Sequence, residues 1–224
     1  MKRILGLAKA SHFGPTLLVT GLSYFFAQLY WWEGPSMVIA LGVFLGQLVV
    51  GWSNDLIDYE DDLRHQRMKK PLVAGTISQD FLMGWLNIVT PLALIINFFG
   101  PLGPIGGGLS ILAIGLAVAY NFYFKFTALS PMPYAIAFAS LPSCMAQSKD
   151  QFPPLWMWLG GALLGTAAHF INVIKDMKQD HVSGIKGLPQ RCGSRVSIVI
   201  ALILIVAAVI LLTTSDLSLP PVAP

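Results

Sequence analysis

The chain has 224 residues, of which 55% are hydrophobic and 11% are charged. Soluble domains are about 25% charged, so this composition excludes an ordinary soluble protein and indicates a polytopic membrane protein. The net charge of +3 is small and gives no reason to expect a nucleic-acid partner.

Seven apolar stretches follow one another along the chain. A membrane-spanning helix needs about 20 mostly apolar residues, and each stretch reaches or approaches that length. The stretches are 14–32, 36–53, 80–99, 103–120, 131–147, 154–174 and 196–214. Helix-breaking pairs such as Gly34-Pro35 and Gly100-Pro101 separate them. We therefore expect an all-α, polytopic transmembrane helical bundle of about seven spans, with residues 1–224 forming a single domain.

The basic residues predict the orientation of this bundle. With seven spans, 13 of the 14 Lys and Arg residues fall on one side of the membrane, and only Lys149 falls on the other. The positive-inside rule assigns the basic side to the cytoplasm. We therefore expect a multi-pass protein of the cell membrane with a cytoplasmic N-terminus.

The first acidic cluster closes the stretch 36–53. Asn54 precedes Asp55, Asp58 and Asp62, whose i, i+3, i+7 spacing places them on one face of a helix. Carboxylates near a bilayer are costly, and negative charge at a helix C-terminus is unfavourable, so a cation should compensate for them. Either Mg²⁺ or the basic residues that follow could supply it. Mg²⁺ binds a few carboxylates together with water and phosphate oxygens.

The second acidic cluster, Asp176 and Asp180, closes the stretch 154–174. Asn172 and His169 lie one and two turns before Asp176 on the same helix face, which suggests a polar, water-filled cavity. Four predicted spans separate the two clusters, an even number, so both should emerge on the cytoplasmic side. There they could face one another and hold Mg²⁺ against a diphosphate.

Basic residues follow the first cluster. Arg67 and Lys70 lie three residues apart before a proline-containing turn, where they could bind phosphate oxygens, the arginine through a bidentate fork. Lys125, which follows Tyr120 and Asn121 in the next cytoplasmic loop, is expected to join them. The alternative is that these residues only mark the cytoplasmic side and meet anionic lipid headgroups.

Taken together, these motifs resemble the two signatures of the UbiA superfamily of intramembrane prenyltransferases, which includes the 4-hydroxybenzoate polyprenyltransferases. The matching residues are Asn54, Asp55, Asp58, Asp62, Arg67 and Lys70 through Gly75 in the first signature, Asp176 and Asp180 in the second, and Tyr120, Asn121 and Lys125 in the connection between the fourth and fifth helices. The similarity extends from about Ser11 to about Arg195.

The resemblance implies Mg²⁺-dependent transfer of a prenyl group from a polyprenyl diphosphate to an acceptor, often aromatic, in a cavity open to the cytoplasm and to lipid. The roles that follow are Mg²⁺ ligation and catalysis by Asp55, Asp58, Asp62, Asp176 and Asp180, diphosphate binding by Asn54, Arg67, Lys70 and Lys125, and lining of the acceptor cavity by Asn172, His169, Tyr120 and Asn121. Members of the family usually have nine spans, so a seven-span chain would lack the last two helices. We expect a partner, most simply a second copy of the chain, to cover that gap. The alternative is that the sequence is a fragment of a longer protein.

Other classes of function stay open. A cation-coupled transporter would also place aspartates in a membrane, but it predicts inverted repeats and helices broken at mid-membrane, whereas these acids gather at one face. A CDP-alcohol phosphotransferase uses intramembrane aspartates and Mg²⁺, but its signature is absent from this sequence. A non-catalytic, truncated family member that acts as a partner subunit is the third alternative.

Overall fold

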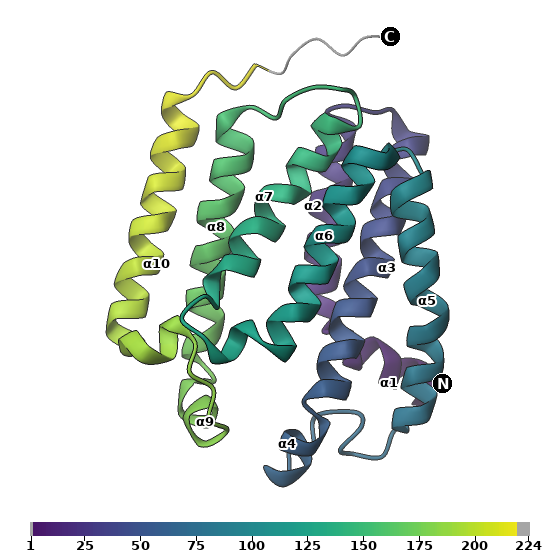
Figure 1. The fold of residues 1–224 in the computed structure, drawn as a ribbon, viewed down its shortest axis with the longest axis vertical. Coiled ribbons are helices and arrows are strands. Elements are labelled where there is room, and N and C mark those ends of the chain that lie inside the picture. The colour runs from purple at the N-terminus through teal and green to yellow at the C-terminus, as the bar shows by residue number, and fades with distance from the viewer. Residues whose placement is uncertain (1, 219–224) are drawn as a thin grey trace. The chain divides into compact units, whose positions relative to one another are not determined.

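The computed structural model describes residues 2–218, and this range is helical without a β-strand, which confirms the expected all-α fold (Figure 1). The helices are α1 (Lys2–Ala10), α2 (Phe13–Gln28), α3 (Glu33–Ile57), α4 (Tyr59–Arg64), α5 (Gln79–Phe99), α6 (Gly103–Phe122), the 3-10 helix η1 (Phe124–Phe126), α7 (Pro131–Gln147), α8 (Leu155–Ile174), α9 (Met177–Val182) and α10 (Leu188–Thr214).

Each of the seven apolar stretches forms a helix. Five of these helices, α3, α5, α6, α8 and α10, are long and apolar enough to cross a membrane. The other two, α2 and α7, have 16 and 17 residues. At 1.5 Å per residue they measure about 24 and 26 Å, slightly less than the hydrocarbon core of a bilayer. The count of seven spans and the side of the N-terminus stay predictions.

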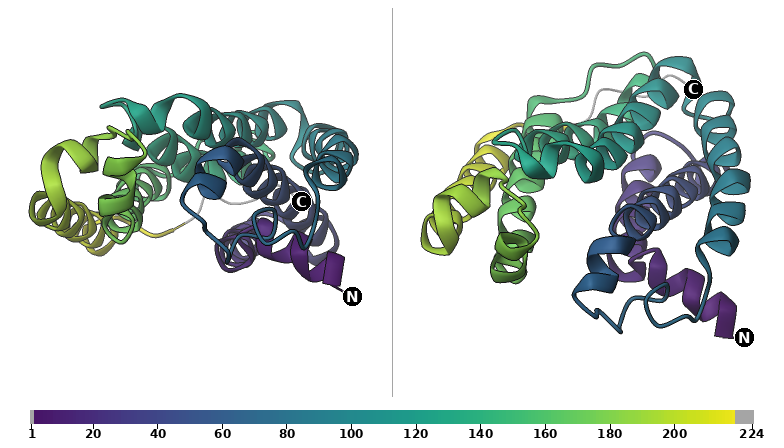
Figure 2. Two further views of the ribbon diagram at one scale, coloured as in Figure 1. Left: turned by 90° about the horizontal axis from the view of Figure 1, so that it is seen from below. Right: turned by 60° about the horizontal axis from the view of Figure 1, so that its bottom comes forward.

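Contacts divide the chain into two compact units, and the boundary falls within α6, between Ile114 and Gly115. The organisation as a single domain stays a prediction. In the first unit, α3 packs between α2 and α5 (Figure 2). The buried Asn97 side chain of α5 donates to the Gly42 carbonyl of α3 at 3.0 Å and accepts a hydrogen bond from Ser110 of α6 at 2.7 Å. This polar network is satisfied, as groups at membrane depth must be.

In the second unit, α8 packs against both α7 and α10. A Cβ atom at Gly165 would lie 2.6 Å from the carbonyl oxygen of Tyr134, so the absence of a side chain there lets α7 and α8 approach closely. Ala167 and Phe170 of α8 bury themselves against Ala201 of α10. The close α7–α8 contact places the Tyr134 ring beside that of His169 in α8.

The short helices α4 and α9 were not expected from the apolar pattern, and each begins within an acidic cluster. Asp58 is at once the C-cap of α3 and the N-cap of α4, and Asp176 is the N-cap of α9. The aspartates of each cluster therefore do not lie on one continuous helix: the chain passes from α3 to α4 in the first cluster and from α8 to α9 in the second. Hydrogen bonds from Asp62 N to Asp58 O at 2.8 Å and from Asp180 N to Asp176 O at 2.9 Å keep the helical spacing across each joint.

Candidate functional site

The first acidic cluster buries two of its carboxylates almost completely. Asp55, in the last turn of α3, and Asp62, in α4, are each 1% exposed, whereas Asp58 at the joint is partly exposed. A buried charge is costly unless a partner compensates it. The cluster therefore requires cations, as the sequence indicated.

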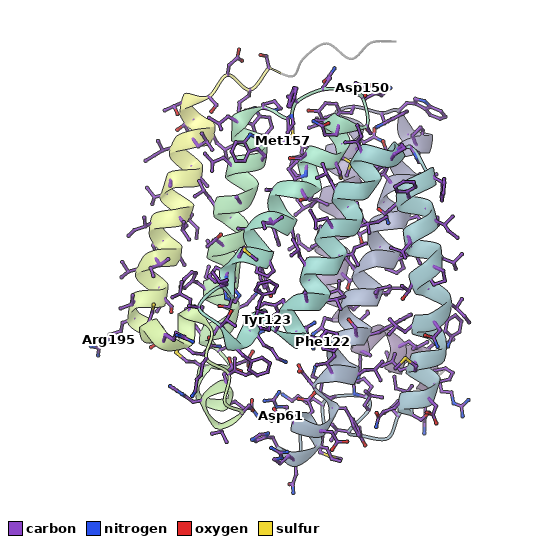
Figure 3. All side chains as sticks on the ribbon, viewed as in Figure 1. Asp61, Phe122, Tyr123, Asp150, Met157 and Arg195 are labelled. Atoms are coloured by element: carbon purple, nitrogen blue, oxygen red, sulfur yellow. The ribbon has the colours of Figure 1, made fainter. Side chains whose placement is uncertain are left out.

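In the structure these cations are the basic residues that follow the cluster. Lys70 Nζ lies 2.5 Å from Asp55 Oδ1 and 3.8 Å from Asp62 Oδ2. Arg67 Nη1 donates to Asp62 Oδ1 at 2.7 Å, and its Nη2 lies 3.6 Å from Asp61, which Figure 3 labels. Of the two sources of compensation that the sequence left open, the structure shows this one. Arg67 and Lys70, two of the residues expected to bind diphosphate, contact the carboxylates.

The pairing leaves two buried atoms without a hydrogen-bond partner, Asp55 Oδ2 and Arg67 Nε. An unsatisfied buried carboxylate oxygen costs free energy that a bound cation would recover. Desolvation raises the pKa of the Asp62 carboxyl above its ordinary value, although the positive charges of Lys70 and Arg67 oppose that shift. The cluster thus has the capacity to take up further positive charge.

The donor atoms of this cluster fit Mg²⁺, which is a hard cation and prefers carboxylate oxygens. Among the described residues, no group of three or more His, Cys, Asp or Glu side chains is already arranged around a common point. Mg²⁺ does not require one, because it commonly takes one or two carboxylates and completes its shell with water and substrate phosphate oxygens. The orphaned Oδ2 of Asp55 is a suitable first ligand.

One residue of this site, His12, was not expected from the sequence. Its Nε2 atom lies 3.3 Å from Asp55 Oδ1 and 3.4 Å from the Asn54 side-chain nitrogen. Asn54 itself is partly buried. A lone histidine 42 residues earlier in the chain carries no local signal for this contact.

In the second acidic cluster the two carboxylates have different surroundings. Asp176 is exposed, whereas Asp180 in α9 is partly buried and accepts a hydrogen bond from Gln190 Nε2 at 2.8 Å. Gln190 is buried, its Oε1 atom has no hydrogen-bond partner, and the sequence analysis missed it. Asn172, in the last turn of α8, is exposed.

The residues expected to line the acceptor cavity include a cluster of rings. His169 is 1% exposed. The centre of its imidazole ring lies 4.7 Å from the centre of the Tyr134 ring and 5.5 Å from that of the Tyr120 ring. His169 Nε2 is 3.0 Å from Ser130 Oγ, which also accepts a hydrogen bond from the Leu188 amide at 2.9 Å. Its Nδ1 atom is buried without a partner. Tyr134 and Ser130 were not expected.

Two further expected residues, Asn121 and Lys125, lie in the sequence between Tyr120 and Tyr134 of this ring cluster. Asn121, near the end of α6, is buried, while its neighbours Phe122 and Tyr123, labelled in Figure 3, are exposed. Lys125 lies in η1, is 7% exposed, and places its ammonium 5.3 Å from the centre of the Phe126 ring. A lysine this deeply buried is unusual for a residue that only marks the cytoplasmic side.

Comparison with known proteins decides the family. A model described as the UbiA prenyltransferase family matches residues 14–223. The chain belongs to this family. A solved structure described as a digeranylgeranylglyceryl phosphate synthase in membranes superposes with a TM-score of 0.70 at 17% identity, covering 94% of this chain and 76% of that chain. No match was found among the curated proteins.

These comparisons confirm the resemblance and the fold of this UbiA family member. An identity of 17% shows a shared fold and no more. The family, together with the apolar helices, identifies an integral membrane protein and supports membrane prenyl transfer from a polyprenyl diphosphate. The roles expected of individual residues stay predictions.

Proposed function

We propose that this protein catalyses Mg²⁺-dependent transfer of a prenyl group from a polyprenyl diphosphate to an acceptor within the membrane. The observation that carries the proposal is Asp55, a carboxylate 1% exposed with one oxygen against Lys70 and the other without a partner. Membership of the UbiA prenyltransferase family supports it. The basic residues that surround the cluster favour the cytoplasmic side for this chemistry.

Asp55, Asp58 and Asp62 would hold one Mg²⁺ ion, and Asp176 and Asp180 would hold a second. When bound, Mg²⁺ neutralises the charge that develops on the diphosphate leaving group as the allylic C–O bond ionises. The same ion would also supply the positive charge that the buried carboxylates of the first cluster require.

Arg67 and Lys70 exchange partners in this mechanism. In the present structure they neutralise Asp62 and Asp55, with Nη1–Oδ1 and Nζ–Oδ1 distances of 2.7 and 2.5 Å. With Mg²⁺ held by the carboxylates, Arg67 and Lys70 would turn to the phosphate oxygens, where the guanidinium would offer its unpaired Nε–H together with a second N–H as a fork. The same two residues thus balance charge before and after the donor binds.

The acceptor that we propose is aromatic. Tyr120, Tyr134 and His169 form a cluster of rings at edge-to-face and tilted angles, a geometry that suits a further ring. The buried Nδ1 atom of His169 in this cluster has no hydrogen-bond partner and could bind a substituent of that ring. The buried Asn121, next to Tyr120 in the sequence, is a second candidate. An electron-rich carbon of the acceptor would attack the prenyl cation, which apolar surroundings protect from water. The proton that this carbon loses would pass to the released diphosphate.

The test is diphosphate release by the purified protein in lipid nanodiscs, with aromatic and glyceryl phosphate acceptors compared. Asp55→Asn should lower the rate by roughly a hundredfold or more, because it removes a metal ligand and its charge. Asp150→Asn, the same change at an exposed aspartate between α7 and α8, should leave the rate unchanged. EDTA should abolish release, and excess Mg²⁺ should restore it. Undiminished release by Asp55→Asn would contradict the proposal.

A further inference from the structure

His12 has a backbone conformation that side chains seldom adopt. It forms the joint between α1 and α2, with φ 52° and ψ 57°, in the left-handed region. A residue other than glycine is strained there, and such strain persists where the surrounding structure enforces it, often at functional sites. The family model begins at residue 14, so this joint lies outside the residues that it matches.

Close packing of the joint on α3 enforces this strain. A Cβ atom at Gly51 would lie 2.6 Å from the carbonyl oxygen of Ser11, so a glycine is required where the two backbones touch. Trp52 Nε1 donates to the Leu7 carbonyl at 3.0 Å, and Thr16 Oγ1 donates to the Ser11 carbonyl at 2.7 Å. Gly51 lies one helical turn before Asp55, so these contacts hold His12 over the end of α3.

The imidazole reaches into the acidic cluster from this joint. Its Nε2 atom lies 3.3 Å from Asp55 Oδ1, 3.4 Å from the Asn54 side-chain nitrogen and 3.5 Å from Lys70 Nζ. The side chain is 44% exposed, whereas that of Asp55 is 1% exposed, so His12 lies at the solvent side of the Asp55–Lys70 pair. A neutral imidazole with its lone pair on Nε2 can accept a hydrogen bond from either nitrogen donor.

We propose that His12 is a positioning residue for Lys70. When a cation binds Asp55, Lys70 loses its carboxylate partner, and His12 Nε2, already 3.5 Å from Nζ, accepts its hydrogen bond and keeps the ammonium at the site for the diphosphate. The carboxylate is thereby free to bind the metal while the lysine stays in place. This inference rests on the proposed function.

The first experiment measures binding of inorganic diphosphate with Mg²⁺ to the full-length protein by calorimetry. Glycine adopts the left-handed conformation freely, so His12→Gly should keep or raise the thermal stability while it raises the diphosphate Kd roughly tenfold, the value of one hydrogen bond to a charged group. Asp150→Gly is the matched control: Asp150 also has a positive φ, 55°, in an exposed loop. It should gain similar stability without a change in diphosphate Kd.

A double-mutant cycle with Lys70→Met then asks whether His12 acts through Lys70. The loss caused by His12→Gly should disappear in the Lys70→Met background, and a loss of equal size in both backgrounds would overturn the proposal. His12→Asn, which also tolerates a positive φ and keeps an acceptor oxygen, should bind with intermediate affinity. An unchanged Kd in both His12 variants would refute the role of His12 alone. Failure of the wild-type protein to bind magnesium diphosphate would overturn the proposed function as well.

Discussion

The buried carboxylates of the first acidic cluster are paired with basic side chains that a metal ion would have to replace. Asp55 and Asp62 are buried, and each is already paired, with Lys70 and with Arg67. A metal ion that arrives alone must compete with these ion pairs. A metal ion that arrives with a diphosphate brings the phosphate oxygens that the displaced cations need. Metal and diphosphate are therefore expected to bind cooperatively, each raising the affinity for the other.

Lys70→Met should change the affinity for the metal ion alone and the affinity for magnesium diphosphate in opposite directions. It keeps an unbranched apolar stem of similar length but removes the ammonium, so Mn²⁺ alone should bind roughly tenfold more tightly, by about 1.4 kcal/mol. Magnesium diphosphate should bind more weakly than to the wild type, since a phosphate partner is lost. Electron paramagnetic resonance of free Mn²⁺ measures the first affinity, and calorimetry the second. The matched control is Lys69→Met, an exposed neighbour with no ion pair to the cluster. Unaltered Mn²⁺ affinity in Lys70→Met would mean that the lysine does not compete with the metal.

Among the elements, the joint between α1 and α2 is placed by backbone contact with α3. Gly51 is the point of contact, because a Cβ atom there would lie 2.6 Å from the Ser11 carbonyl oxygen. The backbone of Ser11 cannot rotate away as a flexible side chain would. The joint between α1 and α2 must therefore move away from α3 if Gly51 is replaced. The position of His12 over Asp55 depends on that contact.

Gly51→Ala should therefore destabilise the protein by about 1–3 kcal/mol, the usual cost of overpacking, and should also weaken binding of magnesium diphosphate. Gly84→Ala in α5 is the control, since nothing lies within 4 Å of a Cβ atom placed there. It should stabilise the helix by about 0.5–1 kcal/mol, because alanine loses less backbone entropy than glycine. Thermal unfolding measures both effects. A Gly51→Ala protein as stable as Gly84→Ala would show that the joint has room to move.

Much of this arrangement was predictable from the sequence, because its signals are local. Length and hydropathy identified all seven long helices, and the spacing of Asp55 and Asp62 identified two carboxylates that the structure buries. The contacts of His12 with Asp55 and of Gln190 with Asp180 were missed, since a lone polar residue in a joint or at a helix start carries no pattern. The helices α4 and α9 were missed because six residues are too few to show a periodicity.

At the scale of the whole molecule, the two acidic clusters are separated by the helices α5, α6, α7 and α8. If each of them crosses the membrane, the chain returns to its starting side after the fourth crossing. The segment after α4 and the segment after α9 then share one side, and the loop between α7 and α8 lies on the other. Arg67, Lys69 and Lys70 lie in the segment after α4, and Lys186 lies in the segment after α9, whereas the loop between α7 and α8 contains Lys149. The side that the first two segments share should therefore be the cytoplasm.

Labelling with a membrane-impermeant maleimide tests this topology in a protein whose own Cys144 and Cys192 are replaced by serine. The exposed positions used are Gln66 after α4, Arg191 in the first turn of α10, and Asp150 between α7 and α8, each changed singly to cysteine. Asp150→Cys should react in intact cells, whereas Gln66→Cys and Arg191→Cys should react only in inside-out vesicles. Labelling of Gln66→Cys and Arg191→Cys from opposite sides would require an odd number of crossings between the clusters. The two sets of carboxylates could then not bind one diphosphate, and the proposed two-metal mechanism would be wrong.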